Sequence, residues 1–235
     1  MSAGQQALTV PPVLHHCVSA RSFRPLWMLE ELGLPYTLRM LPFPPRAAAR
    51  HYLEDNPLGT VPLFVDGAVR MTESAAICQY LTSRIPGTSL AVTPEEPDYA
   101  QWLNWLHQGE ATLTFPQTLV LRYGRFEPME RRQPQVVEDY SRWFLARLKM
   151  VDAALIGDAP WLCAGRFTAA DVSVGYALML ASHLGLLERM SPAIQAYWQR
   201  LQERPAFARA LAAQHQAALD QGVPTTPAPD TGPPA

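Results

Sequence analysis

The chain has 235 residues, a formal net charge of −2, 48% hydrophobic residues and 17% charged residues. This length and composition suit one large domain or two small ones with buried cores. They argue against nucleic-acid binding, because no basic stripe stands out, and against a membrane span, because the longest apolar stretch, around 172–181, is too short. The three cysteines are widely spaced and no His cluster has metal-ligand spacing, so we expect no metal and a reducing, cytoplasmic location.

The first region, residues 12–86, alternates short strand-like and helical segments. Its apolar periodicity and turn residues predict the order β-α-β-α-β-β-α, and therefore an α/β layer with a partly parallel sheet. The expected strands cover 13–17, 36–41, 62–64 and 69–71, and the expected helices cover 24–32, 46–53 and 73–84. Proline and glutamate residues then indicate a linker over 87–97.

From residue 98 to 215 the apolar spacing becomes helical and remains so, which predicts an all-helical domain. The expected helical segments cover 99–113, 136–155, 170–180, 194–201 and 205–213. The third of these is apolar nearly all round, which is typical of a helix at the centre of a bundle. The Gly/Pro/Thr-rich composition of 216–235 predicts a disordered tail.

Thr168 and Asp171 stand at the start of that apolar helix. A threonine followed three residues later by an acidic residue is the pattern of a capping box, here with Asp in place of Glu. A catalytic role for the carboxylate is the alternative interpretation. We favour the structural cap.

Pro62 directly precedes the apolar run 63–65, and Glu73 and Ser74 follow the second strand of the same hairpin. Proline is excluded from strand interiors unless it opens the strand or bends the chain there. If the peptide bond before Pro62 is cis, the backbone of Val61 turns outward and can pair with an extended ligand. Donors at the start of the following helix can hold a carboxylate. The segment is consistent with a peptide clamp, or with an ordinary hairpin that leads into a capped helix.

Ser19 and Ser22 lie just before or at the start of the first helix, where Pro25 fits the first turn. Unpaired N–H groups and the positive end of the helix dipole would stabilise a thiolate that a ligand brings there. A serine hydroxyl donating to the sulfur would lower the thiol pKa further. Either serine could instead be a simple N-cap. Cys17 is expected to be a small core residue and not a nucleophile.

Taken together, the two regions resemble a cytosolic glutathione S-transferase over almost the whole chain. The resemblance is carried by RPLWMLEELGLPY at 24–36, NPLGTVP at 56–62, Glu73-Ser74, FTAAD at 167–171 and RPAF at 204–207. It is strongest with the bacterial and fungal branch that begins with His-His and a serine-containing loop. It implies a thioredoxin-like N-terminal domain that binds glutathione, an all-helical C-terminal domain and a homodimer.

Carried over position by position, the resemblance makes Pro62 the cis-proline and Val61 the residue that pairs with the cysteinyl backbone of glutathione. Glu73 and Ser74 would hold the γ-glutamyl end. Ser19 falls where the serine-type classes place the thiol-activating residue, and Ser22 is the alternative. The two further contacts with glutathione that it implies are Arg21 and Thr60.

The resemblance also implies a pocket for a small apolar electrophile in the helical region. Its expected lining is aromatic and apolar at helical spacing: Trp102, Trp105, Leu106 and Phe115. The same spacing is typical of core, and we expect most of these aromatic side chains to be core. The implied reaction is attack of the glutathione thiolate on that electrophile, in a detoxifying transferase.

Three departures from the family pattern bear on catalysis. Ala20 stands where relatives with a similar opening often have Ser, Thr60 replaces a frequent Gln or Lys, and Pro25 is unusual for the branch. A glutathione-dependent isomerase of the maleylacetoacetate type is one alternative, although the chain lacks the cysteine of that motif. A binding or scaffold protein that keeps the fold without the chemistry is the other.

Overall fold

A computed structural model describes residues 10–233, which form two compact units. The sheet unit comprises the described residues up to Ala91 together with Pro205–Ala228. The helical unit comprises Val92–Arg204 with the described residues from Pro229 onward. The α/β part and the mostly helical part that the sequence predicted are both confirmed.

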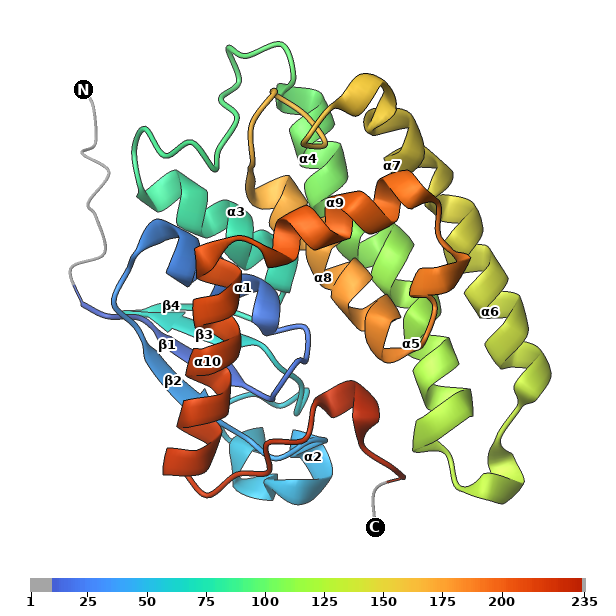
Figure 1. Ribbon diagram of the computed structural model, residues 1–235. Helices are drawn as coiled ribbons and strands as arrows, with labels where there is room; N and C mark the ends of the chain where they lie inside the picture. The colour runs from blue at the N-terminus through green and yellow to red at the C-terminus, as the bar shows by residue number, and fades with distance from the viewer. Residues whose placement is uncertain (1–9, 234–235) are drawn as a thin grey trace. The chain divides into compact units, whose positions relative to one another are not determined.

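The sheet unit is built on four strands in the order β2-β1-β3-β4 (Figure 1). β1 is parallel to β2 and antiparallel to β3, and β3 and β4 form a hairpin. The strands are β1 Val13–His16, β2 Thr37–Met40, β3 Leu63–Asp66 and β4 Val69–Met71, and the helices are α1 Phe23–Leu32, α2 Pro45–Ala48, α3 Ser74–Arg84 and α10 Pro205–Asp220. Two neighbouring parallel strands need a crossover connection, usually a helix, and α1 connects β1 to β2 in this way.

The two faces of this sheet are used differently, because side chains alternate along each strand. Leu14 and Phe64 are opposite one another in the register, and both are fully buried. The Phe64 ring contacts Tyr80 of α3, which shows that this face is the one covered by helices. His15 points to the other face, where its ring lies 5.3 Å from that of Tyr52.

α10 belongs to the sheet unit, which differs from the predicted helical domain over 98–215. It lies beside α1 and over β2 (Figure 1). The ring of Phe207 meets Trp27 edge-on at 4.9 Å, and the Arg209 guanidinium lies 2.9 Å from the Glu30 carboxylate. The Phe207–Trp27 contact shows that the apolar face of α10 packs against α1 of the sheet unit.

The predicted disorder of 216–235 also differs from the structure within the described residues. α10 continues to Asp220, the Gln221 side chain bonds both Met40 N–H and Leu38 C=O, and a short helical turn covers Ala228–Asp230. Composition alone predicts disorder wrongly here, because the Gln221 side chain hydrogen-bonds the backbone of β2 and holds the segment in place. Residues 234 and 235 lie outside the described residues.

The helical unit is organised around α8, whose residues are buried over nearly its whole length. Its helices are α4 Tyr99–Gln108, α5 Phe115–Leu121, α6 Pro134–Arg147, α7 Lys149–Ala154, α8 Ala169–His183 and α9 Pro192–Gln202. Gly109 follows α4 where a Cβ atom would lie 2.3 Å from Ser173 Oγ, so only glycine allows this approach to α8.

The capping box at the start of α8 is confirmed. Thr168 Oγ1 accepts from Ala170 N–H, and the Asp171 carboxylate accepts from Thr168 N–H at 2.8 Å. The same carboxylate accepts from Leu162 N–H at 3.2 Å and from Tyr197 O–H at 2.8 Å. The Thr168 hydroxyl also donates to it at 3.2 Å, so four donors bind this one buried carboxylate. These bonds explain the carboxylate as a structural group.

Two expected helices are interrupted. Residues 46–53 form the short α2 and a separate 3₁₀ turn, and 136–155 form α6 and α7 with a break at Leu148. In the described part of the chain, no helix is long and apolar enough to cross a membrane. Among the same residues, no group of three or more His, Cys, Asp or Glu side chains could hold a metal ion.

Candidate functional site

The turn that leads into β3 is held in place by side chains from the segment before it. The Val61–Pro62 peptide bond is cis. The carbonyl of Thr60 accepts from Tyr52 O–H and from Asn56 Nδ2, both at 2.8 Å. Burial raises the pKa of Tyr52 to about 12, so its hydroxyl keeps the proton that it donates. The backbone beside Val61 is thus positioned before any ligand arrives.

Glycine at position 59 is part of the same support. Gly59 has a φ of +58°, and a Cβ atom there would lie 2.6 Å from Cβ of Arg46. A larger residue would therefore meet both backbone strain and a clash. The NPLGTVP run owes its glycine to this close approach.

The N-terminus of α3 has no side-chain cap. Glu73 is the N-cap residue with an extended backbone, and its side chain makes no capping hydrogen bond. The first N–H groups of a helix lack partners within the helix, and with the dipole they attract anions. Ser74 follows directly and is almost fully buried.

Arg24 of α1 adds a cation to this end of α3. It is fully buried, and its Nη1 donates to Ser74 Oγ at 3.2 Å. Because guanidinium is only a donor, the Ser74 oxygen acts as acceptor, and its own hydrogen is directed to another group. A ligand carboxylate at this helix start would be such an acceptor.

The loop between β1 and α1 carries Ser19 in a left-handed conformation. Its φ is +55°, which is uncommon for a residue other than glycine and recurs at functional sites. Hydrogen bonds from Ala20 N–H to Cys17 C=O at 3.1 Å and from Phe23 N–H to Ala20 C=O at 2.8 Å close the loop. Burial raises the pKa of the Cys17 thiol far above its ordinary value, so this cysteine is core, as the sequence predicted.

A buried polar network lies behind this loop. Gln214 of α10 accepts from Ser19 N–H through Oε1 at 2.9 Å and donates from Nε2 to Ser19 Oγ at 3.3 Å. His16 Nε2 lies 2.9 Å from the same Oε1, and His16 Nδ1 lies 2.6 Å from Ser22 Oγ. Burial lowers the pKa of His16 to about 4, so the ring is neutral near pH 7.

Ser22 occupies the N-cap position of α1, but its hydroxyl makes no capping bond. That hydroxyl is directed to His16 instead. Ser19 and Ser22, the two alternatives from the sequence, are therefore both members of one network with different partners.

The chain returns to this loop near its C-terminal end. Ala228 N–H donates to Val18 C=O at 2.7 Å, and the Ala228 side chain is buried. It belongs to one apolar cluster with Cys17, Ala20 and Val61. The Ser19 loop and the Val61 turn are thus joined through shared packing.

The remaining predicted glutathione contacts are more accessible. Thr60 and Glu73 are exposed, and Arg21 is half-buried. A cavity of about 520 Å³ in the sheet unit lies elsewhere, on the face of His15, and includes none of the predicted site residues. Its polar lining is His15, Arg39, His51, Tyr52, Asp55, Arg70 and Gln221.

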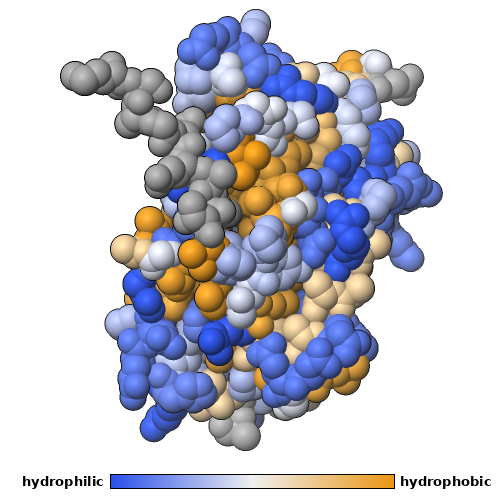
Figure 2. Space-filling view, turned by 90° about the vertical axis from the view of Figure 1, so that its left-hand side faces the viewer, coloured by the Kyte–Doolittle hydropathy of each residue, from blue (hydrophilic) through white to orange (hydrophobic). Residues whose placement is uncertain are grey.

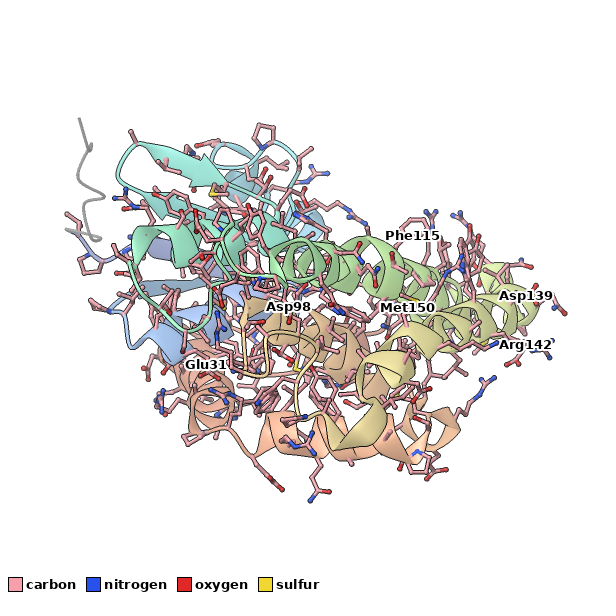
Figure 3. The ribbon with its side chains drawn as sticks, turned by 90° about the horizontal axis from the view of Figure 1, so that it is seen from above. Glu31, Asp98, Phe115, Asp139, Arg142 and Met150 are labelled. Atoms are coloured by element: carbon pink, nitrogen blue, oxygen red, sulfur yellow. The ribbon has the colours of Figure 1, made fainter. Side chains whose placement is uncertain are left out.

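Three of the four residues predicted to contact an electrophile lie in the core of the helical unit. Trp102, Trp105 and Leu106 are 3%, 2% and 0% exposed. Phe115, at the start of α5, is 51% exposed and lies at the surface of its unit (Figure 3). Their helical spacing is therefore that of a core stripe, as the alternative interpretation held, and only Phe115 presents a large apolar face.

Sequence reasoning missed Gln214 and Arg24. Gln214 lies on the buried face of α10, four residues from Ala210 and from Ala218. A polar amide at a core position of a helical repeat was the available signal, since such a group must find buried partners. Arg24 carries the same signal within the buried first turn of α1.

The architecture places the molecule in a class: a thioredoxin-like sheet unit with a cis-proline turn before β3, together with a mostly helical unit. The family model of the glutathione S-transferase N-terminal domain matches residues 18–84. Glutathione S-transferase GstA of Escherichia coli O157:H7 is 32% identical over 171 residues, which is 69% of this chain and 78% of that protein.

Two further similarities agree. Glutathione S-transferase 3 of Schizosaccharomyces pombe is 39% identical over 104 residues, and the match spans 43% of this chain and 42% of that protein. The solved structure titled as a ternary complex of BphK, a bacterial GST, has a TM-score of 0.75 at 26% identity, covering 86% of this chain and 98% of that one. The chain belongs to the glutathione S-transferase family and is an enzyme of the transferase class.

Proposed function

We propose that this protein joins the thiolate of glutathione to small apolar electrophiles. The observation that carries the proposal is the shared packing of the Ser19 loop and the Val61 turn in one cluster of the sheet unit. One segment offers a hydroxyl to a sulfur, and the other offers backbone groups to the peptide that bears the sulfur. The relatives named glutathione S-transferase support the same reading of the site.

Each group has a role in this proposal. The Val61 backbone pairs with the cysteinyl residue of glutathione, as a strand would. The N-terminus of α3, with Ser74 and Glu73, holds the γ-glutamyl carboxylate and ammonium. Arg21 and Thr60 make the outer polar contacts.

Ser19 donates its hydroxyl hydrogen to the sulfur and thereby lowers the thiol pKa, because a hydrogen bond to the charged form favours that form. The thiol releases its proton to solvent water, and the bound thiolate then attacks the electrophilic carbon. As the carbon–sulfur bond forms, the bond from that carbon to its leaving group breaks, and the leaving group, a halide ion in the test reaction below, departs with the electron pair. Binding in a defined orientation supplies the rest of the rate acceleration. No metal is needed for any of these steps.

The proposal includes a homodimer, a cytoplasmic location and a detoxifying role. Figure 2 shows apolar side chains exposed among hydrophilic ones on the side of the molecule that it views. Val69 of the hairpin strand β4 is one exposed apolar residue of the sheet unit. Burial of such surface between two copies of the chain is the expected source of dimer stability.

The test combines binding with turnover. Glutathione is titrated by calorimetry, and conjugation to a generic aromatic halide is then measured for the wild type and for Ser19→Ala. We expect binding in the wild type, and a loss of kcat of about 10- to 100-fold in Ser19→Ala with little change in the glutathione Kd.

Ser22→Ala is the matched control, since it removes a hydroxyl from the same loop. Loss of turnover in Ser22→Ala but not in Ser19→Ala would transfer the role to Ser22. Absence of glutathione binding at millimolar concentration would contradict the proposal and favour a protein that keeps the fold without the chemistry.

A further inference from the structure

We propose that the cavity on the His15 face of the sheet is a second ligand site, which binds a small organic phosphate: a phosphate monoester that carries an aromatic group. The cavity, of about 520 Å³, belongs to the sheet unit, and its lining includes none of the residues predicted to bind glutathione. A volume of this size is within the range of pockets that hold small molecules. The proposal goes beyond the proposed function and does not depend on it.

The strand register gathers two arginines on this face of the sheet. Arg39 of β2 pairs with His15 of β1. Val65 of β3 pairs with Val13 of β1 on one side and with Arg70 of β4 on the other. Paired residues point to the same face of a sheet, and all five of these side chains line the cavity. The floor is therefore apolar at its centre, with one arginine on each outer strand (Figure 1).

His15 supplies a buried polar group without a protein partner. The residue is only 9% exposed, and its ring makes no hydrogen bond with any residue that the structure describes. The neighbouring Tyr52 ring lies 5.3 Å away, but its hydroxyl already donates to Thr60 C=O at 2.8 Å. Buried polar groups are normally hydrogen-bonded, so an unsatisfied imidazole beside a cavity points to a polar ligand.

The charges around the cavity favour an anion. Arg70 is partly neutralised, because its Nη2 donates to Asp55 C=O at 2.8 Å and lies 3.8 Å from the Asp55 carboxylate. Arg39 is exposed and makes no hydrogen bond or ion pair within the described part of the chain, and the same holds for His51 in the cavity wall. The described lining thus sets two guanidinium groups and two imidazoles against one carboxylate.

A phosphate monoester matches this set better than a carboxylate does. It carries a charge of about −1.5 to −2 near pH 7, and its oxygens accept from an arginine fork and from imidazole N–H groups. Burial lowers the pKa of His15, the Asp55 carboxylate opposes this effect, and Arg39 and Arg70 add to it. A dianion beside the ring would favour the protonated imidazole, so binding of a phosphate and protonation of His15 would reinforce each other.

The aromatic part of the ligand has an apolar surface to cover. Val13 and Val65 lie directly opposite one another on β1 and β3, and Met40 and Leu41 line the same cavity. Neighbouring strands are about 4.8 Å apart, so a ring that covers Val13 has the strand of Arg39 beside it. Burial of the ring then adds to the affinity, a gain that inorganic phosphate lacks.

The test compares four probes on the full chain: 1-naphthyl phosphate, 1-naphthoate, 1-naphthol and inorganic phosphate. The readout is the His15 ring proton resonance, assigned by its absence from His15→Phe, because a probe bound far from this ring does not titrate it. We expect 1-naphthyl phosphate to bind with a Kd below about 1 mM, and about tenfold more tightly than each of the other three.

Each other outcome overturns a stated part of the proposal. Absence of a His15 shift with 1-naphthyl phosphate overturns the site. Equal affinity for 1-naphthol overturns the need for an anion, and equal affinity for inorganic phosphate overturns the apolar subsite. Equal or tighter binding of 1-naphthoate overturns the choice of phosphate over carboxylate.

Arg39→Gln tests the cation that lacks a protein partner. We expect it to raise the Kd of 1-naphthyl phosphate about 5- to 10-fold, because a charge-assisted hydrogen bond is lost at a partly solvated position. Arg46→Gln is the matched control: Arg46 is an exposed arginine of α2 in the same unit, outside the cavity lining, and its replacement should change the Kd by less than about twofold. An unchanged Kd in folded Arg39→Gln would contradict the proposal.

The pKa of His15 in the wild type gives a measurement that needs no variant of the charged residues. It is read from the same ring resonance as a function of pH, with and without 1-naphthyl phosphate. We expect the bound probe to raise this pKa, and an unchanged value at saturation would show that the phosphate does not lie beside the ring. Glutathione is absent from all of these samples, so failure of the proposed function would leave the results unaffected.

Discussion

Two buried polar networks, one in each unit, are built from similar parts and differ in how far along the chain their members lie. In the helical unit, the Asp171 carboxylate gathers donors from Leu162, Thr168 and Tyr197. In the sheet unit, the Gln214 amide gathers Ser19 and His16. The Asp171 network is the N-cap of α8 with Tyr197 added. The Gln214 network connects the loop before α1 to α10, 195 residues further along the chain.

The difference lies in what each centre can do with its hydrogen bonds. The Asp171 carboxylate only accepts, so each of its partners is a donor that is satisfied by this bond. The network therefore stabilises the fold. Gln214 both accepts and donates, so it can hold donors and acceptors of the loop before α1 at the same time. The Asp171 network stabilises one helix start, whereas the Gln214 network fixes a loop against a distant helix.

The largest expected effect in this comparison is on the structural side. Asp171→Ala leaves Thr168 N–H, Leu162 N–H and Tyr197 O–H buried without their acceptor, and we expect it to lower the free energy of unfolding by about 3 to 5 kcal/mol. Urea denaturation measures this change. The thiol pKa of glutathione bound to the folded fraction should not move, because no atom of the sheet unit is altered.

Asp139→Ala is the matched control for that variant. Asp139 lies on the exposed side of α6, where its carboxylate accepts from Gln135 (Figure 3). Its removal should change the free energy of unfolding by less than about 0.5 kcal/mol. A loss at Asp171 as small as this would show that the four-donor network contributes no stability.

The next effect is a pH dependence carried by His16. Burial lowers its folded pKa from 6.5 to about 4, so the unfolded chain binds the proton more readily between these values. Its stabilising contribution is therefore complete above about pH 6.5 and is lost as the pH falls toward 4. The loss amounts to about 3 kcal/mol in the free energy of unfolding.

The measurement compares the wild type with His16→Gln by urea denaturation at pH 7 and pH 4.5. Asp171 works in the opposite direction, since burial raises its pKa to about 6 and its protonation stabilises the folded state as the pH falls. The Asp171 contribution to the free energy of unfolding is the same in the wild type and in His16→Gln, so it cancels when the two proteins are compared. Equal pH dependence in the two proteins would contradict the assignment of His16 as a buried neutral ring.

The same contrast explains how much was predictable. The cap at Thr168 and Asp171, the hairpin after Pro62 and the strand-helix order all depend on residues close in sequence, and local rules found them. The loop serines were also found, but the choice between Ser19 and Ser22 stayed open. Gln214, which bonds Ser19, was missed because α10 was assigned to the helical region. Apolar spacing predicts a helix but not the unit against which that helix packs.

The C-terminal segment shows a second limit. Its Gly/Pro/Thr-rich composition predicts disorder, yet Gln221 bonds the edge of β2 and Ala228 is buried in the cluster that contains Val61. Both contacts involve residues more than a hundred positions away. Composition cannot anticipate a long-range partner. The helical spacing of Trp102 and Trp105 did indicate core, but it could not single out Phe115 as the exposed member of that set.

The central claim is that Ser19 lowers the thiol pKa of bound glutathione, and a comparison of two serine variants tests it most directly. The thiol pKa of bound glutathione is measured from the ultraviolet thiolate band for the wild type, Ser19→Ala and Ser22→Ala. The account predicts that Ser19→Ala raises this pKa by about 1 to 2, because a hydrogen bond to the charged form is lost. A wild-type thiol pKa in folded Ser19→Ala would contradict it.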